Sequence, residues 1–410
     1  MKKSLFAIAA VTAFAGAAQA QSSVTVYGIL DMGFGGGNYR NAQPTTVNKS
    51  TALSVQQAGQ ATSRLGFRGT EDLGGGSAAF FTFETGLLPN SASNDSGLLS
   101  TFNNRQAFIG LSQKGLGRVS MGTQQTTIHD VVSRTTAGAN NNVVGDLIYT
   151  VNGAAGGAGI GTQTSYGLTG GQSYTVRANN TIKFATENLS GFQGNAMFIL
   201  NGNDTTQNSA TSGGSNSTMG WGLGVNYTFK TLFLTANYQS LNNQVTVATP
   251  GTSPTTAPNT FTIFGAGQNP TMGRNVNDNQ MYLAGTYDFG ILQAFASYIN
   301  RKASADNNSL YFQRYTAQQL GVRSNLTKTV NVFASVSTGA WENTGFDVQS
   351  ANINGYQLGT NYVLSKRTNL YAIWGNASQS NAANSTINPA TARNTSYNAN
   401  NYAVGMRHTF

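Results

Sequence analysis

The sequence has no cysteine, and only 9% of its 410 residues are charged. Without cysteine, neither disulfides nor thiolate metal sites can form. The charged fraction is far below the roughly one quarter that is typical of soluble globular domains, so a water-exposed globular surface explains this composition poorly. Beyond residue 20 no apolar run is long enough for a membrane-spanning helix, which excludes a helical membrane protein.

The first twenty residues follow the pattern of a secretory signal peptide. Lys2 and Lys3 form a positive region, an apolar stretch covers 5–18, and Ala18-Gln19-Ala20 gives the small-x-small cleavage site. The alternative is an N-terminal membrane anchor, but the apolar run is too short to span a bilayer. The sequence therefore predicts a cleaved signal peptide over 1–20 and one mature domain over 21–410.

The basic residues exceed the acidic ones but do not cluster. The formal net charge is +9, which becomes +7 when Lys2 and Lys3 are subtracted. The cations are scattered singly, without a basic run or basic helix, which argues against a nucleic-acid partner. A modestly positive channel for anions is the better interpretation.

The residues after the signal peptide repeat with period two. In Met281-Leu283-Gly285-Tyr287 the apolar set alternates with Tyr282, Ala284 and Thr286, as expected of strands with one apolar face. About sixteen such segments of about ten residues are present, the length needed to cross a membrane at a tilt. They begin near Val24, Arg64, Ser77, Arg105, Arg118, Thr181, Gly194, Met219, Leu232, Gln280, Ile291, Tyr315, Val330, Asn352, Thr368 and Asn400.

The connections between these segments alternate in length. Short turns are expected at 72–76, 113–117, 187–193, 230–231, 288–290, 325–329 and 365–367. Long loops rich in Asn, Ser, Thr and Gly are expected at 37–63, 88–104, 125–180, 203–218, 243–279, 303–314, 343–351 and 380–399. Short turns on one side and long loops on the other are typical of a transmembrane barrel. The fold class is therefore predicted to be all-β, an antiparallel up-and-down barrel of about 16 strands that closes because lipid tolerates no open sheet edge.

Aromatic residues gather near the predicted strand ends. An interfacial girdle is the favoured interpretation, and ordinary packing within the sheet is the alternative. The set comprises Tyr27, Phe34, Phe80, Phe81, Phe83, Tyr227, Phe229, Tyr287, Phe289, Tyr362, Tyr371 and Trp374.

Several motifs together resemble the general diffusion porins of the β-proteobacterial outer membrane. They are Ser23-Val24-Thr25-Val26-Tyr27-Gly28-Ile29-Leu30-Asp31, Ser63-Arg64-Leu65-Gly66-Phe67-Arg68-Gly69-Thr70-Glu71-Asp72-Leu73-Gly74-Gly75-Gly76, Asn104-Arg105-Gln106-Ala107-Phe108-Ile109-Gly110-Leu111, Gly115-Leu116-Gly117-Arg118-Val119, Tyr362-Val363-Leu364-Ser365-Lys366-Arg367-Thr368-Asn369-Leu370-Tyr371 and Val404-Gly405-Met406-Arg407-His408-Thr409-Phe410. The resemblance implies a homotrimer of 16-stranded barrels in the outer membrane that passes small hydrophilic solutes and ions. It also implies a third loop, within 125–180, that folds inward to narrow the channel. No cofactor and no metal site are expected.

The C-terminus resembles the sequence that the barrel assembly machinery reads. Tyr402 and Phe410 share one face of a last strand that ends on an aromatic residue. The simpler interpretation is a strand that closes the barrel against 24–34, and the two are compatible.

Selectivity in such a pore needs fixed charges at a constriction. Arg64 and Arg68 alternate with Leu65 and Phe67, and Lys183 alternates with apolar neighbours, so these cations are expected in the lumen. A guanidinium on the lipid side near the midplane would cost ~2–4 kcal/mol. The alternation leaves Arg105 ambiguous, and only the family resemblance assigns it to the basic wall. The alternative for each cation is a charge at the barrel rim that contacts lipopolysaccharide phosphate in the surrounding outer-membrane lipid.

Acidic residues are expected opposite the basic wall. Asp130 and Asp146 are the only carboxylates of the predicted inward loop, and Glu84 should face inward beside Thr82. Facing charges of opposite sign would create a field across the pore. The loop departs from the family pattern, since it has no Pro-Glu-Phe-Gly-type segment and Thr123 stands where many relatives have a cation.

Three other functions fit the sequence less well. An outer-membrane hydrolase would need a nucleophile and a base, and the neighbouring His129 and Asp130 are the only candidates for a dyad. A solute-specific channel would line its lumen with aromatic tracks, whereas this lumen is expected to be mixed polar. An adhesin or β-solenoid would need a fixed-length repeat, and none is evident.

Overall fold

The computed structural model describes residues 23–42, 47–57, 59–87, 89, 104–139, 141–148, 177–209, 212–245, 275–305, 310, 312–344, 350–380 and 396–410. The predicted signal peptide lies outside these described residues. The strands are β1 (Ser23–Ala42), β2 (Val47–Gln57), β3 (Arg64–Gly74), β4 (Ser77–Gly86), β5 (Asn104–Gln113), β6 (Gly117–Gln125), β7 (Arg177–Thr186), β8 (Phe192–Ser209), β9 (Ser212–Phe229), β10 (Leu232–Val245), β11 (Asn275–Asp288), β12 (Gln293–Ala305), β13 (Phe312–Asn325), β14 (Val330–Thr344), β15 (Ala351–Val363), β16 (Thr368–Gln379) and β17 (Ser396–Thr409). Within the described residues the one helix is α2 (His129–Thr135), and no helix there is long and apolar enough to cross a membrane.

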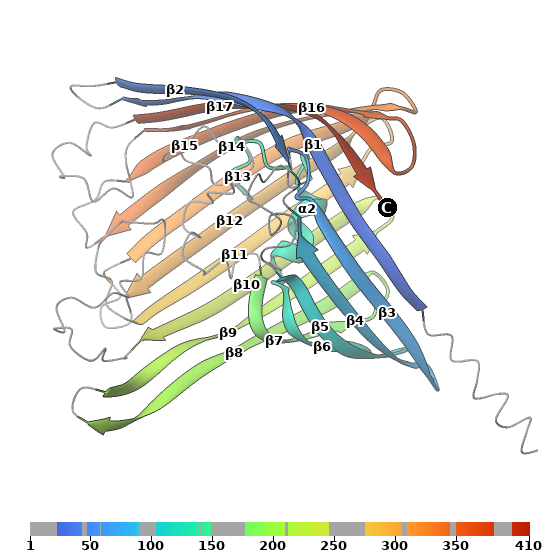
Figure 1. Cartoon of the computed structure of the whole chain (residues 1–410), viewed down its shortest axis with the longest axis vertical. Coiled ribbons are helices and arrows are strands. Elements are labelled where there is room, and N and C mark those ends of the chain that lie inside the picture. The colour runs from blue at the N-terminus through green and yellow to red at the C-terminus, as the bar shows by residue number, and fades with distance from the viewer. Residues whose placement is uncertain are drawn as a thin grey trace, which may run out of the picture.

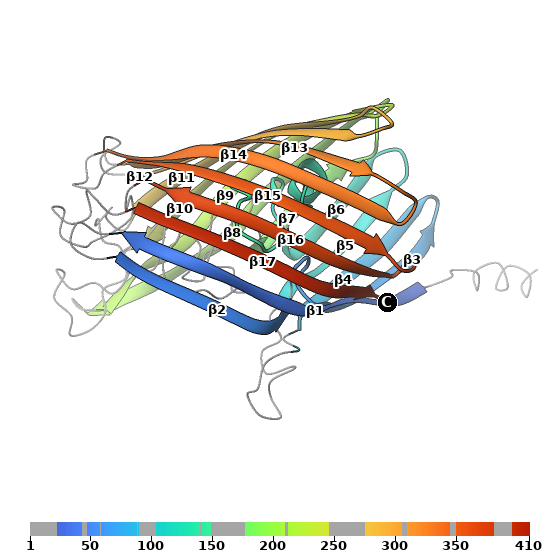
Figure 2. The same ribbon diagram turned by 90° about the horizontal axis from the view of Figure 1, so that it is seen from above.

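The strands form a closed antiparallel barrel (Figures 1 and 2). β1 pairs with β17 along most of its length, which joins the two ends of the sheet. On its other edge β1 pairs with β2 through residues 32–42 and with β3 through residues 23–29. β2 and β3 therefore occupy one position in the barrel, and the seventeen segments of the described chain fill sixteen positions. The predicted 16-stranded barrel is confirmed, which excludes the β-solenoid alternative.

Side chains alternate between a lipid-facing wall and an inner wall. On β1 the Val24 side chain is 66% exposed on the outside, whereas Asp31 on the opposite face is 0% exposed. β15 shows the same strict alternation, with Tyr356 and Leu358 outside and Gln357 buried inside. This arrangement gives the barrel a mainly apolar outer wall toward the hydrocarbon and a polar inner wall.

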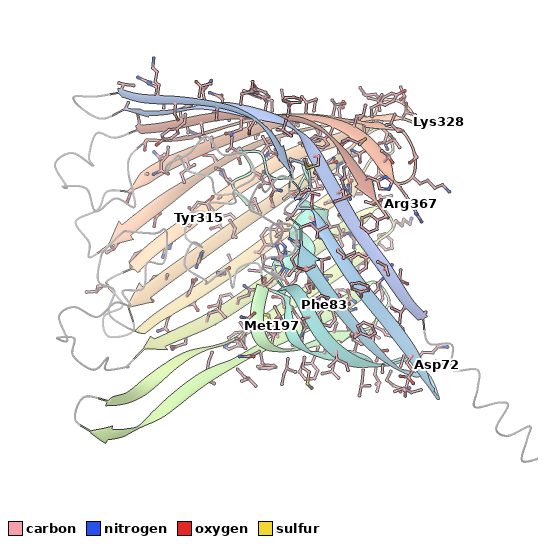
Figure 3. The ribbon with its side chains drawn as sticks, in the orientation of Figure 1. Asp72, Phe83, Met197, Tyr315, Lys328 and Arg367 are labelled. Atoms are coloured by element: carbon pink, nitrogen blue, oxygen red, sulfur yellow. The ribbon has the colours of Figure 1, made fainter. Side chains whose placement is uncertain are left out.

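The short connections gather at one end of the barrel. Asp72, Lys328 and Arg367, each in or beside a short turn, mark that end in Figure 3. All seven predicted short turns are present between consecutive strands. Two predicted long loops are wrong in part, because β2 lies within 37–63 and the β8–β9 hairpin continues through much of 203–218. The sequence 203–218 is rich in Asn, Ser and Thr and shows no apolar alternation. In β2 the alternation is short, and its apolar members Val47, Leu53 and Val55 are exposed on the outer face.

Part of the connection after β6 folds into the barrel. α2 lies inside the ring of strands in both Figure 1 and Figure 2 and contacts β11 and β12. Its apolar side chains and those of 147–148 form a buried cluster with the inner wall. The members are Ile128, Val131, Val132, Leu147, Ile148, Phe233, Tyr282, Ala303, Tyr315, Ala317, Ala351 and Ile353. The predicted inward third loop is therefore confirmed for its described residues, 126–139 and 141–148.

Candidate functional site

The inner wall beside α2 carries a carboxylate between two guanidinium groups. Glu84 on β4 is 4% exposed, and its Oε1 lies 2.6 Å from Arg105 Nε and 3.9 Å from Arg64 Nη1. The Tyr27 hydroxyl donates a hydrogen bond to the other carboxylate oxygen, Oε2, at 3.2 Å. Arg64 Nε also donates to the Thr62 carbonyl at 3.0 Å, which holds that guanidinium near the wall. Glu84 thus lies on the same wall as the cations rather than across from them.

Arg105 faces inward because β5 contains a bulge. Glu84 pairs with Gln106, but the next residue, Thr85, pairs with Asn104, so Arg105 is skipped in the register. In an unbroken strand, Arg105 would lie on the same face as Ile109, which is exposed on the lipid side. The extra residue turns the Arg105 side chain to the inside, where it meets Glu84. A simple alternation could not place this residue, which explains why the sequence left it ambiguous.

Lys183 ties the wall to the inward loop. Its ammonium group makes an ion pair with the Asp130 carboxylate in the first turn of α2. It also donates to the Gln125 carbonyl at 2.9 Å. Thr181 and Lys183 are buried on the inner face of β7, as the alternation predicted. Asp130 therefore contacts the basic wall directly.

The two remaining predicted charges, Arg68 and Asp146, lie apart from the Lys183–Asp130 ion pair. Arg68 is exposed and stacks its guanidinium 5.4 Å from the Tyr27 ring centroid. Asp146 is buried, and its Oδ1 accepts a hydrogen bond from the Ile148 backbone N–H at 2.9 Å. The structure therefore brings Arg64, Arg105 and Glu84 together and pairs Lys183 with Asp130, but it holds Asp146 within the folded loop.

The buried His129 lies near several cations of the site. Burial lowers the pKa of this imidazole well below 6.5, and four nearby cations lower it further. These four, here called the basic cluster, are Arg177, Arg105, Lys183 and Arg64. His129 is therefore neutral at neutral pH, and each of these four cations contributes to the lowered pKa.

The inward loop is fastened to the far wall by side chains of β13, β14 and β15. Gln357 Nε2 donates to the Val143 carbonyl at 2.6 Å and to the Val144 carbonyl at 3.1 Å. The Tyr315 hydroxyl, labelled in Figure 3, donates to the Leu147 carbonyl at 2.6 Å. Ser337 Oγ donates to the Gly145 carbonyl at 2.8 Å. These bonds fasten the loop to the inner face of β13, β14 and β15.

Sequence reasoning missed several residues of this site. Tyr27 was assigned to a lipid-facing girdle, but it faces inward and bonds Glu84. The assignment of Tyr371 to the aromatic girdle is also wrong, because Tyr371 is buried inside the barrel and donates a hydrogen bond to Asp31. Period-two alternation with Asp31 would have placed Tyr27 on the inner face. No local pattern could have identified Gln357 as a loop anchor.

The C-terminal residue completes the barrel seam. Phe410 and Gly28 exchange backbone hydrogen bonds at 3.1 and 3.2 Å. A Cβ on Gly28 would lie 2.2 Å from Phe410 Cζ, so the ring occupies the space that glycine leaves. Tyr402 is exposed on the outer face of β17. Closure against 24–34 is confirmed, whereas reading by the assembly machinery remains a prediction.

No metal centre is present in the part of the chain that the structure describes. Groups of three or more His, Asp or Glu side chains with metal-binding spacing do not occur there. His129 and Asp130 are adjacent in α2, but Asp130 is engaged with Lys183.

Comparisons with known proteins fit this geometry. A family model described as Gram-negative porin matches residues 7–382. An outer membrane porin protein of Bordetella pertussis is 27% identical over 405 residues, covering 91% of this chain and 93% of that protein. Outer membrane porin protein 32 of Delftia acidovorans is 36% identical over 203 residues, covering 47% of this chain and 48% of that protein.

Solved structures share the barrel fold. The anion-selective porin from Comamonas acidovorans superposes with a TM-score of 0.65 at 20% identity, covering 95% of this chain and 100% of that chain. The trimer form of OmpT, an outer membrane protein of Vibrio cholerae, superposes with a TM-score of 0.58 at 16% identity, covering 95% of this chain and 99% of that chain.

Proposed function

The chain belongs to the Gram-negative porin family, and from that premise we propose that its pore prefers anions mildly over cations. As a porin it forms a passive diffusion channel in the outer membrane, which confirms the predicted function and location. The same membership confirms that it is not an enzyme. The selectivity of the channel is the open question.

One observation carries the proposal. The basic cluster places four cations beside the inward loop, and the carboxylates that form ion pairs with members of this cluster are Glu84 and Asp130. An ion that keeps most of its water responds to the local field rather than to a coordination shell. A net positive constriction raises the local concentration of anions and lowers that of cations. The structurally similar porin from Comamonas acidovorans is anion-selective, which supports the same preference here.

The constriction charges act together in this proposal. Arg64, Arg105 and Lys183 are the members of the basic cluster that also belong to the predicted basic wall, and Glu84 and Asp130 reduce their net charge. Arg68, which is exposed beside the Tyr27 ring, contributes from a greater distance in this proposal. Asp146 has a different role, since its carboxylate caps the loop backbone at Ile148 rather than meeting the passage.

A solute-specific channel is the alternative. Equal liposome-swelling rates for sugars of equal size would exclude it.

Reversal potentials in planar bilayers test the proposal. In asymmetric KCl the purified protein should give stepwise conductance. The sign of its zero-current potential should show that chloride is more permeant than potassium. R64E and K183E should each move that potential toward the cation side. R40E is the matched control, because Arg40 is exposed on the outer face of β1 and should change it little. A strongly cation-selective potential in the unmodified protein would contradict the proposal.

We also propose that three copies of the chain associate. The trimer form of Vibrio cholerae OmpT supports this by its shared fold. Contacts with outer-membrane lipid, with lipopolysaccharide and with the barrel assembly machinery are proposed with it. Light scattering in detergent, corrected for bound detergent, should give three times the mass of the mature chain. That mass is 43.0 kDa less the signal peptide.

A further inference from the structure

Two phenylalanines lie on the inner wall of the barrel. Phe80 on β4 alternates in step with Glu84, which is buried on the inner face, whereas Phe81 is 39% exposed on the outer face. Phe108 on β5 is the register partner of Thr82, which lies between Phe80 and Glu84 on the same inner face. The assignment of Phe80 to the lipid-facing girdle is therefore wrong, because its ring lies inside.

The Phe80 and Phe108 rings form a corner, here called the aromatic corner. Their centroids are 6.4 Å apart, and their planes are inclined by 78°. Phe80 lies close against the wall, because a Cβ added at Gly110 on β5 would be only 2.5 Å from Phe80 Cζ. Both phenylalanines are half-buried, so part of each ring faces the interior of the barrel. Apolar surface left exposed among polar side chains is typical of a binding surface.

Two cations flank the aromatic corner. Arg68 on β3 pairs with Thr82 and is therefore a diagonal neighbour of Phe80, at about 7–8 Å. Arg118 on β6 is likewise a diagonal neighbour of Gly110, the glycine under the Phe80 ring. Both arginines are exposed, and among the described residues no ion pair joins either of them to a carboxylate. Their charges are therefore available to a solute.

The aromatic corner lies between the basic cluster and the short-turn end. The Arg68 guanidinium lies 5.4 Å from the centroid of the Tyr27 ring, and the Tyr27 hydroxyl bonds Glu84 beside the basic cluster. Phe80 lies four residues from Glu84 along β4, about 13 Å at 3.3 Å per residue. β4 begins near the turn at Asp72, which marks the short-turn end in Figure 3. An anion that leaves the basic cluster toward this end therefore meets Arg68 and then the aromatic corner.

We propose that Phe80, Phe108, Arg68 and Arg118 form a binding site for carboxylates that carry an aromatic ring. The proposal rests on the anion preference proposed above, since the basic cluster must first admit the solute. A planar ring can stack on one phenylalanine and meet the other edge to face, and both geometries are favourable. The carboxylate of the same solute is then in reach of a guanidinium fork, which matches it. A small carboxylate gains only the charge, and a neutral aromatic solute gains only the stacking.

Block of the channel current by benzoate tests this site. In planar bilayers in KCl, added benzoate should reduce the single-channel conductance saturably, because a bound carboxylate obstructs and repels chloride. The readout is the half-blocking concentration. Acetate lacks the ring and benzyl alcohol lacks the charge, so each should need at least a fivefold higher concentration than benzoate.

Variants of the aromatic corner separate stacking from bulk. F80L/F108L keeps apolar side chains and removes the rings, so it should raise the half-blocking concentration of benzoate at least fivefold. F80Y/F108Y keeps the rings and should stay within twofold of the unmodified protein. The matched control is F67L/F81L, because Phe67 and Phe81 are exposed on the outer face, and it should leave the block unchanged.

The charge requirement is tested separately. R68Q/R118Q keeps both rings and should also raise the half-blocking concentration of benzoate at least fivefold. Equal block by benzoate and acetate, in a channel that prefers chloride to potassium, would overturn the site and leave the proposed selectivity intact. Equal block of F80L/F108L and the unmodified protein would also overturn it. A zero-current potential without chloride preference would instead contradict the proposed selectivity, so the two failures are distinguishable.

Discussion

The Tyr371 hydroxyl on β16 donates a hydrogen bond to Asp31 Oδ1 on β1 at 2.5 Å, across the intervening strand β17. The other oxygen of Asp31 accepts from the backbone N–H groups of Gln60 and Ala61 at 2.9 and 2.6 Å. These bonds hold the break between β2 and β3 against the inner wall. The Gly59 carbonyl in that break accepts from the Asn142 backbone N–H at 3.1 Å. Asp31 therefore supports the seam of the barrel and the inward loop together.

Replacing Tyr371 by Phe should destabilise the barrel. The change removes one donor from a fully buried carboxylate, and an unsatisfied buried group costs about 1–3 kcal/mol. Denaturant unfolding in detergent should therefore show a lower midpoint for Y371F. Y362F is the control, because Tyr362 is exposed on the outer face of β15 and its hydroxyl should contribute little. Equal loss of stability in both variants would show that the Asp31 bond is unimportant.

Glu84→Gln should strengthen the anion preference. The carboxylate lies between Arg64 and Arg105, so the neutral amide would leave two cations uncompensated. A change of about one kT in local potential alters the local anion concentration about 2.7-fold, and we expect a shift of that order in the chloride-to-potassium permeability ratio. The zero-current potential in asymmetric KCl measures it.

The control for that experiment is Glu187→Gln. Glu187 is exposed beside the turn between β7 and β8, away from the inward loop. If E84Q moved the potential toward cations, the assignment of Glu84 to the pore wall would fail.

The sequence predicted the barrel well because one physical rule governs every strand. Each strand has a face toward lipid and a face toward water, so apolar residues recur with period two. This rule placed Arg64 and Lys183 on the inner wall. It could not place Arg105, because a bulge is visible only once β4 and β5 are in register.

The anchoring of the loop could not be predicted for a different reason. Asn141 and Gln357 bond each other at 2.8 Å although 216 residues separate them in the sequence. Nothing near either residue specifies that contact, since it depends on closure of the whole barrel. The ends of β8 and β9 were missed because their sequence has no apolar alternation. β2 was missed because its alternation, carried by Leu53 and Val55, is short and lies in an otherwise polar stretch.

His129 should remain neutral in the folded channel between pH 6 and pH 8. Its pKa is lowered well below 6.5 by burial and by the basic cluster. An unfolded chain would protonate this imidazole near its ordinary value of about 6.5, so the unfolded state binds more protons below that pH. The contribution of His129 therefore makes the barrel less stable as the pH falls from 6.5 toward the lowered pKa.

Two measurements check the behaviour of His129. The zero-current potential should stay constant from pH 6 to pH 8, because no charge changes on this side chain. The difference in unfolding midpoint between pH 5 and pH 8 should be smaller in H129Q than in the unmodified protein. A potential that titrates near pH 6.5 and loses this dependence in H129Q would contradict the lowered pKa.

Replacing Gln357 by Ala should widen the pore. The amide of Gln357 satisfies the Val143 and Val144 carbonyls, and each buried carbonyl left without a donor costs about 1–3 kcal/mol. That cost favours detachment of this part of the inward loop from β15 and entry of water. Single-channel recordings of Q357A should show higher conductance and more current noise. Q318A is the control, because Gln318 is exposed on the outer face of β13 and makes no contact with the loop across the barrel wall. Unchanged conductance in Q357A would mean that Tyr315 and Ser337 hold the loop without it.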